Sequence, residues 1–582
     1  MTESHERLLG QISRQSLMEF TEEISKEVRL SGSEEELRAF RYAEQQLKSF
    51  GFETNLYHRK ALISLPMESK LQINGVSYTS ITHSMAPSTP EIGVSGEIVY
   101  MENGFPLERD PDLADKVLLT DGLATPGALL QAQTHMPKAV IFINAEYTHE
   151  MIVSTVWGNP AFDQLGQYPK IPAVSITFAD GEILKAKLSL EEKLLAEIMT
   201  QVDTAWRDIP TLIADYKGSE DVNPYVLFSG HIDSWHHGAM DNGSANATML
   251  EVARIIGTNK TKLHRSLRLA FWSGHSHGRY AGSALYADEH WEDLYDNCVL
   301  HLNIDSVGGK NSSVLSEANA MAETKDIVAE PILKYADQEF NSTRYGKAGD
   351  QSFWGMGVPS LLMGLSEQVK SDNPASQAFS KLFGDGKAGG FGWWWHTTED
   401  TIDKLDPVLL ERDCRIYLAT VLEICTNPLL PIKQQNAIKE IIGFIRNYQR
   451  SLPEPEWLGI ALNRLEKLDT TVKRLTDLVH AADFPSAHSI RTYNHWNKQL
   501  SRILVRLNYV GGNRFSHDTA TPKMPIPLLA EISQLEQHEP SPAYYSLLTT
   551  IRRNINEVNF NLREALELSE QTLKNWEEIQ NG

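Results

Sequence analysis

The segment at residues 230–247, GHIDSWHHGAMDNGSANA, brings together side chains that could bind a divalent metal ion. It directly follows the apolar run YVLFS, which is typical of a buried strand. His231 and Asp233 are therefore predicted to stand at the carboxyl end of a strand, where α/β sheets place their ligands. Asp241 follows in a glycine-rich loop. Histidine and aspartate suit an ion such as zinc, and one carboxylate can bridge two ions. We expect Asp233 to hydrogen-bond the far nitrogen of His231 and so orient that ring.

Two later segments offer further ligands after strand-like or glycine-rich stretches. The run HLNIDSVG ends a predicted strand with Asp305, and HTTEDT begins with His396 after a glycine-rich loop and three tryptophans. Each of these residues alone is more often structural. Their combined order, a histidine, two aspartates and a second histidine after successive strands or loops of one domain, makes coincidence the weaker interpretation. The predicted metal ligands are His231, Asp241, Asp305 and His396.

The order of these motifs, HxD, D-N, N-x-D-S and HT-x-x-DT, resembles that of the co-catalytic zinc aminopeptidases and carboxypeptidases. The layout of the whole chain looks like the branch that contains glutamate carboxypeptidase and the transferrin receptor. That branch has a protease-associated insert, a zinc-peptidase domain and a C-terminal helical dimerisation domain. The resemblance covers nearly all of the chain, and in the C-terminal helices it extends to structural class only.

The resemblance implies a role for each ligand. In the family, the counterparts of His231 and Asp305 hold the first ion. The counterpart of His396 and an additional glutamate hold the second ion, and the counterpart of Asp241 bridges both. We therefore expect one or two zinc ions, with another divalent transition metal as the alternative. Asp350, in GDQSFWGMGVPS, resembles the acid that precedes the last strands of the family's domain.

The chain departs from the family after the predicted strand LRLAFW. The family carries two adjacent glutamates there, one as general base and one as metal ligand, whereas residues 274–283 read GHSHGRYAGS and contain no glutamate. The segment is also one residue longer than in the family, so the alignment is ambiguous. Strand register puts His275 at the position of the base, and counting back from Gly282 puts His277 at the position of the ligand.

Histidine can replace both glutamates in principle. If the segment is extended, His275 and His277 point to the same side and both face the metal. Imidazole is a good zinc ligand and a competent general base near neutral pH. We therefore expect His275 to transfer the proton and His277 to bind metal, and we count Asp233, behind His231, with His275 among the catalytic residues. The alternative is a degenerate site like that of the transferrin receptor.

Substrate contacts are predicted beside these residues. Trp395, the last of the three tryptophans before His396, is a candidate wall of a substrate pocket, and core packing is the alternative. Arg279 and His237 are further candidates for contact with the substrate.

The elements that must position these residues alternate between strand and helix from Tyr225 to about Thr426, which predicts a largely parallel α/β sheet. Residues 93–224 contain short apolar runs that alternate with helical patterns, which predicts a small inserted module. After Pro431 the apolar residues have helical spacing throughout, as in a four-helix bundle. We expect an α/β zinc-peptidase domain (residues 1–92 and 225–430), a protease-associated insert (93–224) and a helical dimerisation domain (431–582).

Composition indicates which classes of partner and which cellular compartment to expect. A formal net charge of -22 argues against nucleic acid or an anionic membrane as the main partner. The absence of a long apolar run predicts no membrane span, and the polar N-terminus does not read as a secretory signal. Three cysteines without a CxxC pair favour a reducing compartment, so we expect a cytoplasmic protein. By resemblance, it is expected to be a homodimer.

These observations predict a metal-dependent hydrolase that cleaves a peptide or other amide with metal-activated water. Two alternatives stay open. One is a specialised amidohydrolase that acts on a small non-peptide substrate, because fold does not determine chemistry. The other is a catalytically inactive homologue that acts as a binding protein.

Overall fold

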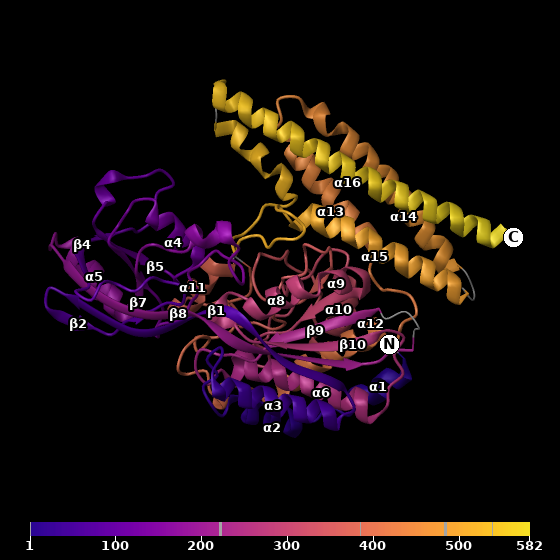
Figure 1. Ribbon diagram of the computed structural model, residues 1–582, viewed down its shortest axis with the longest axis horizontal. Helices are drawn as coiled ribbons and strands as arrows, with labels where there is room; N and C mark the ends of the chain where they lie inside the picture. The colour runs from indigo at the N-terminus through magenta and orange to yellow at the C-terminus, as the bar shows by residue number, and fades with distance from the viewer. Residues whose placement is uncertain (1, 220–223, 384–385, 482–485, 538, 582) are drawn as a thin grey trace.

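The computed structural model describes residues 2–581 except 220–223, 384–385, 482–485 and 538. The fold is mixed α/β, as expected, with one large sheet that has helices on both sides and a separate group of C-terminal helices (Figure 1). No helix in the described ranges is long and apolar enough to cross a bilayer. Met1 and Gly582, the ends of the first and last expected domains, lie outside those ranges, as does the segment just before the expected boundary at residue 224.

The centre of the sheet is parallel, and its strand order is β12-β11-β9-β10. These strands span Ser360–Leu361, Cys298–Asn303, Tyr225–His231 and Ser266–Trp272. Every residue of β9 and β11 is buried, because helices cover both faces of the sheet. Parallel strands all end at the same edge, so the residues that follow β9, β10 and β11 are brought together there.

One face of this sheet packs against α2 (Arg14–Ser25), α3 (Glu34–Ser49), α6 (Ala245–Thr258) and α12 (Pro407–Thr426), which share a large apolar core with the strands (Figure 1). The other face packs against α8 (Ala281–Glu289) and α9 (Trp291–Asn297) through a smaller core around Trp272 and Tyr286. The remaining helices before the bundle are α1 (Glu3–Leu9), α4 (Pro126–Gln133), α5 (Phe178–Ser189), α7 (His275–Gly278), α10 (Lys325–Ala336) and α11 (Pro374–Phe383).

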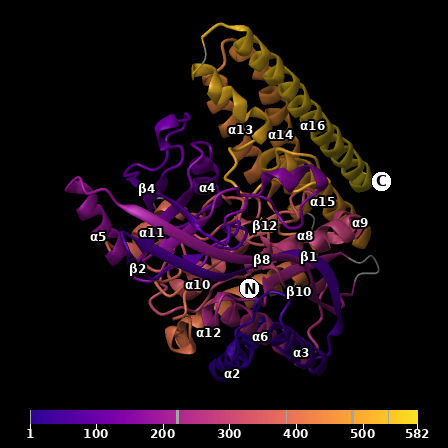
Figure 2. The same ribbon diagram turned by 60° about the vertical axis from the view of Figure 1, so that its left-hand side comes forward.

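Two long antiparallel strands, β1 (Glu53–Ile73) and β8 (Leu195–Tyr216), carry the sheet from the centre into the insert (Figure 2). At one end β8 pairs with β10 through Leu212–Tyr216, and at the other it pairs with β4 (Val94–Tyr100). The expected domain boundaries therefore stay a prediction, since a single strand of the insert also belongs to the central sheet.

Beyond β8, on the side away from the parallel centre, the strands follow the order β4-β5-β6-β7-β3. Strands β5 (Val117–Asp121), β6 (Ala139–Ile143) and β7 (Ala173–Ile176) are parallel, and β3 (Ile81–Thr82) closes the edge antiparallel to β7. Strand β2 (Val76–Tyr78) forms a hairpin with the end of β1. The apolar residues of these strands form a core of their own, separate from that of the central sheet.

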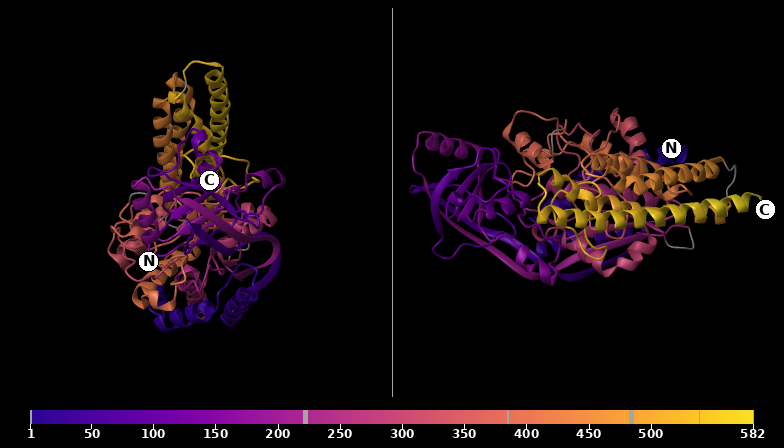
Figure 3. Two further views of the ribbon diagram at one scale, coloured as in Figure 1. Left: turned by 90° about the vertical axis from the view of Figure 1, so that its left-hand side faces the viewer. Right: turned by 90° about the horizontal axis from the view of Figure 1, so that it is seen from above.

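Four long helices follow the sheet and share one apolar core: α13 (Gln434–Arg450), α14 (Gly459–Ala481), α15 (Ala487–Tyr509) and α16 (Pro542–Asn581). They stand on the side of the sheet opposite to α2 and α3 (Figures 1 and 3). Helix α15 connects the four helices to the sheet domain, because the buried guanidinium of Arg502 donates hydrogen bonds to the carbonyl oxygens of Tyr295 and Gly357. The loop after α15 returns to the sheet, where Ala520 packs with Trp157 and Tyr280.

Candidate metal centre

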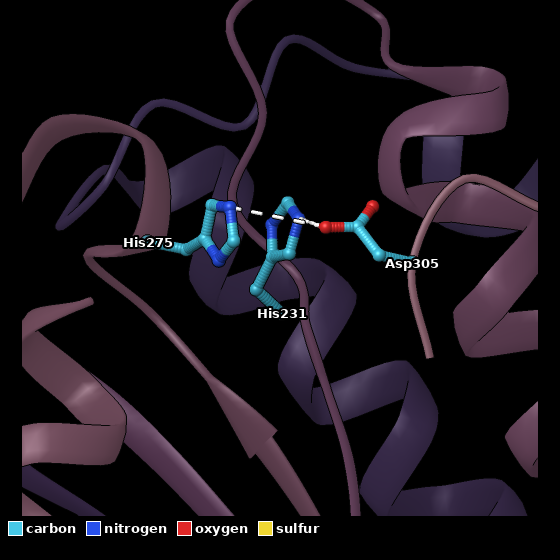
Figure 4. Close-up of side chains that lie close together, drawn as sticks. All are labelled: His231, His275 and Asp305. Carbon is cyan, nitrogen blue, oxygen red and sulfur yellow. Dashed lines mark ion pairs between the residues drawn. The ribbon is translucent and has the colours of Figure 1, made fainter. Parts of the chain in front are cut away.

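Three side chains that could share a metal ion meet at the carboxyl edge of the parallel strands (Figure 4). His231 is the last residue of β9, His275 follows β10 and Asp305 follows β11. One ligand atom of each lies within 4.8 Å of those of the other two. The structure thus brings His231 and Asp305 together as the sequence predicted, and it adds His275 to the same group.

Asp241 lies between His231 and His396, two of the three histidines that were predicted to bind metal. Its Oδ1 is 3.2 Å from Nε2 of His231, and its Oδ2 is 3.0 Å from Nε2 of His396. Nε2 of His231 is also 3.5 Å from Oδ2 of Asp305. The carboxylate of Asp241 thus has one oxygen directed at each half of the centre, which is the arrangement of a bridging ligand.

The electrostatics of the centre favour a cation. Burial would lower the pKa of His231, but the charge of Asp305 and the close carboxylates of Asp233, Asp241 and Asp305 raise this pKa well above its ordinary value. Burial would likewise raise the pKa of Asp241, but His231 and His396 hold it well below its usual range. A histidine surrounded by three carboxylates is stabilised by a positive charge, whether a proton or a metal ion supplies it.

The loop that carries Asp241 is held from both sides by residues that the sequence analysis did not identify. The buried Arg29 donates to the carbonyl oxygens of Ile232 and His237, at 2.8 and 2.6 Å. The carboxylate of Asp400 accepts the N–H groups of Met240 and Asp241, each at 2.9 Å. Asp400 belongs to the quoted motif HTTEDT, so its place in that motif was the available signal, whereas nothing near Arg29 marked it.

A glycine is required at the start of the same loop. Gly238 has a φ of 52°, and a Cβ atom at this position would lie 2.2 Å from the carbonyl oxygen of Asp241. A side chain would therefore displace the residue that faces both histidines.

His275 lies on a short helix rather than on the extended segment that the sequence analysis assumed. Helix α7 covers only His275–Gly278, and it is bounded by Gly274, Arg279 and Tyr280, which all have positive φ. Nδ1 of His275 is 2.9 Å from Oδ2 of Asp350, and the ring stacks on that of His231 with centroids 3.7 Å apart and planes 11° apart.

The helix turns His277 away from His275, because residues two apart on a helix do not share a face. Nδ1 of His277 is 2.9 Å from the Ser31 hydroxyl, and its ring lies 4.4 Å from that of Trp235. Burial, followed by the charges of His236 and His396, lowers the pKa of His277 to about 4 in spite of Asp233. His277 is not in the group formed by His231, His275 and Asp305. Its predicted role as a metal ligand stays a prediction.

Asp233 orients His231 through its main chain rather than its carboxylate. Its carbonyl oxygen is 2.9 Å from Nδ1 of His231, whereas Oδ1 of the carboxylate is 3.5 Å away. The carboxylate instead accepts the hydroxyl of Ser31 at 2.6 Å and the N–H of Ser276 at 2.8 Å. Asp233 thus joins the end of β9 to the start of α7.

Two of the three predicted substrate contacts, Trp395 and Arg279, are buried next to the centre. The ring of Trp395 stacks on His396 with centroids 3.4 Å apart. The guanidinium of Arg279 donates to the carbonyl oxygen of Ile152. These contacts make both residues supports of the site, and contact with a substrate stays a prediction for each. The ring of His237 faces α2, with Nδ1 3.1 Å from the carbonyl oxygen of Ser25.

Glu150, from the insert, reaches the metal centre and was not predicted. Its N–H donates to the carbonyl oxygen of His396 at 2.9 Å, and its own carbonyl oxygen is 2.6 Å from Nδ1 of His396. Its carboxylate Oε1 is 3.7 Å from Nε2 of His236, and burial raises the pKa of Glu150 to about 8. A lone glutamate in a loop of the insert carries no periodic or motif signal, so only the fold identifies it.

Part of the chain matches a known family. Residues 211–421 match the family described as peptidase family M28. Probable glutamate carboxypeptidase VP8 of Zea mays is 32% identical over 114 residues, which cover 19% of this chain and 16% of that protein. Carboxypeptidase Q of Xenopus laevis is 27% identical over 255 residues, which cover 43% of this chain and 49% of that protein. The chain therefore spans about one sixth and about half of the length of these two relatives.

Solved structures resemble the fold over a larger part of the chain. An aminopeptidase from Aneurinibacillus sp. strain AM-1 aligns with a TM-score of 0.54 and 22% identity, over 72% of this chain and 96% of that chain. A peptidase M28 precursor from Shewanella amazonensis SB2B aligns with a TM-score of 0.55 and 19% identity, also over 72% and 96%. These likenesses concern the fold, and they agree with the expected α/β zinc-peptidase architecture.

Proposed function

We propose that this protein is a metal-dependent hydrolase of peptide or other amide bonds, because residues 211–421 match peptidase family M28. One observation carries the proposal. Asp241 directs one carboxylate oxygen at Nε2 of His231 and the other at Nε2 of His396, and Asp305 lies 3.5 Å from the same atom of His231.

The residues present fit a zinc ion. Nε2 of His231 is buried and lies 3.2 Å from Oδ1 of Asp241 and 3.5 Å from Oδ2 of Asp305, so the three atoms could share one ion. Nδ1 of His231 is 2.9 Å from the carbonyl oxygen of Asp233, a contact typical of metal-bound histidines. A bound zinc ion would supply acidity for a water molecule and polarise the amide carbonyl. His231, Asp241 and Asp305 would hold the first ion, and Asp241 and His396 would contribute to a second.

His275 is the proposed proton acceptor. Two imidazoles that bind one ion must converge on it, whereas the rings of His231 and His275 are nearly parallel, 11° apart, and stacked. This geometry favours a role for His275 beside the ion rather than on it. Asp350 fixes the ring through Nδ1 and leaves Nε2, which is 3.9 Å from Oδ2 of Asp305, directed at the centre. Such an acid–histidine pair is suited to taking a proton from water.

Elemental analysis of the purified protein, together with a peptide-library cleavage assay, tests the proposal. A metallopeptidase is expected to contain stoichiometric zinc and to cleave members of the library, with cleavage lost on chelation and restored by zinc. Stoichiometric metal without any peptide cleavage would instead favour the specialised amidohydrolase. Protein that binds no metal under any growth condition would favour the inactive homologue.

Three further features stay proposals. The small parallel sheet around β5 and β6 is consistent with a protease-associated insert. The buried, unpaired thiols of Cys298, Cys414 and Cys425 suit a reducing compartment such as the cytoplasm. The C-terminal helices are proposed to form a homodimer, and neither nucleic acid nor a membrane is proposed as a partner.

A further inference from the structure

A cavity of about 430 Å³, a size typical of small-molecule sites, lies between the sheet domain and the C-terminal helices. Three of the residues that line it are cationic. Lys325 is the first residue of α10, Arg344 follows that helix in the chain, and Lys439 lies on α13. Among the described residues of the lining, Glu440 is the one acid. The cavity is therefore lined mainly by positive charge.

Arg344 and Glu440 neutralise each other at the wall of this cavity. Nη1 of Arg344 is 3.2 Å from Oε2 of Glu440, and the same oxygen accepts a hydrogen bond from the side-chain amide of Asn508 at 2.6 Å. The guanidinium also donates to the carbonyl oxygen of Asn508 at 2.6 Å and lies 3.8 Å from the centre of the Tyr509 ring. These contacts hold Arg344 in place and leave the charges of the two lysines unbalanced.

Lys325 and Lys439 have neither an ion pair nor a side-chain hydrogen bond within the part of the chain that the structure describes. The acid beside Lys325, Asp326, pairs instead with Lys433, whose Nζ lies 2.9 Å from Oδ2 of Asp326. The chain as a whole has a formal net charge of -22, so most of its lysines have acids to pair with. Two unpaired lysines that line one cavity of such a chain indicate an anionic ligand.

We propose that this cavity binds a phosphate group, carried either by a small phosphorylated metabolite or by free phosphate. Phosphate has a charge of about -1.5 to -2 at pH 7 and several acceptor oxygens, which matches two ammonium groups. The side chains of Asn341 and Ser342 also line the cavity, and neither donates a hydrogen bond to a described residue. A carboxylate is recognised best by the two parallel N–H groups of an arginine, and Arg344 is already paired with Glu440.

A ligand in this cavity would connect two parts of the chain. Lys325 belongs to the sheet domain and Lys439 to the C-terminal helices, so a phosphate that contacts both holds α13 against α10. A ligand that binds only this native arrangement raises the midpoint of thermal unfolding. The site is independent of the proposed hydrolase function, because none of the residues that line it belongs to the metal centre.

Calorimetry and thermal unfolding of the full-length protein test the proposal, with inorganic phosphate, ribose 5-phosphate, ribose and succinate as probes. At least one of the two phosphate probes is expected to bind and to raise the unfolding midpoint, whereas ribose and succinate should do neither. Tighter binding of ribose 5-phosphate would identify a phosphorylated metabolite as the source, and tighter binding of inorganic phosphate would identify the free ion. Binding should weaken as the ionic strength is raised.

Variants show whether the phosphate lies in this cavity. The double variant Lys325→Gln/Lys439→Gln is expected to bind the phosphate probe at least about 10-fold more weakly, because it removes two charged donors. Lys439→Gln alone changes an exposed residue and should weaken binding in the same direction, which keeps the test valid if the double variant does not fold. Lys170→Gln, at an exposed lysine of the insert, should bind like wild type.

Three results would overturn the proposal. The first is that neither phosphate probe binds to the wild-type protein. The second is that succinate binds as tightly as the phosphate probes, which would make the site a general anion site. The third is that the folded lysine variants bind phosphate as tightly as wild type, which would place the bound phosphate elsewhere, for example at the metal centre.

Discussion

Oδ2 of Asp350 lies 2.9 Å from Nδ1 of His275, and this contact joins an acid in the segment between α10 and β12 to the first residue of α7. Asp350 is buried, and its other oxygen has no hydrogen-bond partner among the described residues. The pair therefore holds one face of the His275 ring toward the centre and restricts which nitrogen carries the proton.

Replacement of His275 separates its two possible roles. If it is the proton acceptor, His275→Ala should retain its zinc and lose about 10²–10⁴-fold in kcat. Asp350→Asn should lower kcat in the same direction with zinc retained. The double variant should be no slower than His275→Ala, because Asp350 acts through the histidine. Elemental analysis and steady-state kinetics provide the readouts, and loss of zinc in His275→Ala would identify a metal ligand instead.

Asp241→Ala should remove metal more completely than Asp305→Ala or His396→Ala. Its carboxylate faces both His231 and His396, so its loss affects both halves of the centre. Metal content after dialysis against a weak chelator measures the order. Asp403→Ala, which removes an exposed carboxylate, is the control. Full retention of metal by Asp241→Ala would refute the bridging assignment.

His277→Ala tests the position where the structure and the resemblance differ. The ring of His277 packs on Trp235 and forms a hydrogen bond with the hydroxyl of Ser31. We therefore expect an unchanged zinc content and a loss of about 1–3 kcal/mol in the free energy of unfolding. Elemental analysis and denaturant titration measure the two quantities. Loss of one of two ions would instead show that His277 binds metal when the centre is loaded.

Burial of Glu323, which is not one of the metal-centre residues, makes the free energy of unfolding depend on pH. Glu323 is 2% exposed, and burial raises its pKa from 4.5 to about 7. Between these values the unfolded chain loses this proton while the folded chain keeps it, so stability falls as pH rises through this range. Glu323→Gln should therefore be more stable than wild type above about pH 7, by up to about 3 kcal/mol, and should show no gain below about pH 4.5. Thermal unfolding across this range measures the difference, and a gain independent of pH would contradict it.

The proposed dimer is testable by light scattering of the full-length chain. Ile460 on α14 and Phe560 on α16 are apolar and 58% and 49% exposed, as expected of helices with a further partner. We expect a dimer at micromolar concentration and weaker association in Phe560→Asp. A monomeric wild-type protein under these conditions would count against the proposal.

The ligands that were predicted from the sequence share one property: each follows a strongly apolar strand or a glycine-rich loop. His231 ends β9 and Asp305 follows β11, so the periodicity of the strands was enough to place them at one edge of the sheet. The alternation of strands and helices predicted the parallel order around them for the same reason. Local pattern and fold agree here, because a buried parallel strand must be apolar along its length.

The features of the site that were not predicted depend on contacts between residues distant in sequence or on unusual backbone conformations. Glu150 meets His396, and Arg29 meets the loop after β9, only because the fold brings them together. The helical turn at His275 needs positive φ at Arg279 and Tyr280, neither of which is a glycine. Residues of these types rarely adopt that conformation, so the sequence favoured an extended segment. The consequence was the assumption that His275 and His277 face the same way.

The paired hydrogen bonds between Glu150 and His396 would link the docking of the loop that carries Glu150 to the loading of the metal centre. The carbonyl of Glu150 orients the imidazole that faces Asp241, so an ion at this position favours the docked insert, and the docked insert favours the ion by the same free energy. A partner that draws the insert away from the central sheet would thereby release metal. Withdrawal of metal would in turn loosen the insert, and its amide hydrogens would exchange faster with solvent.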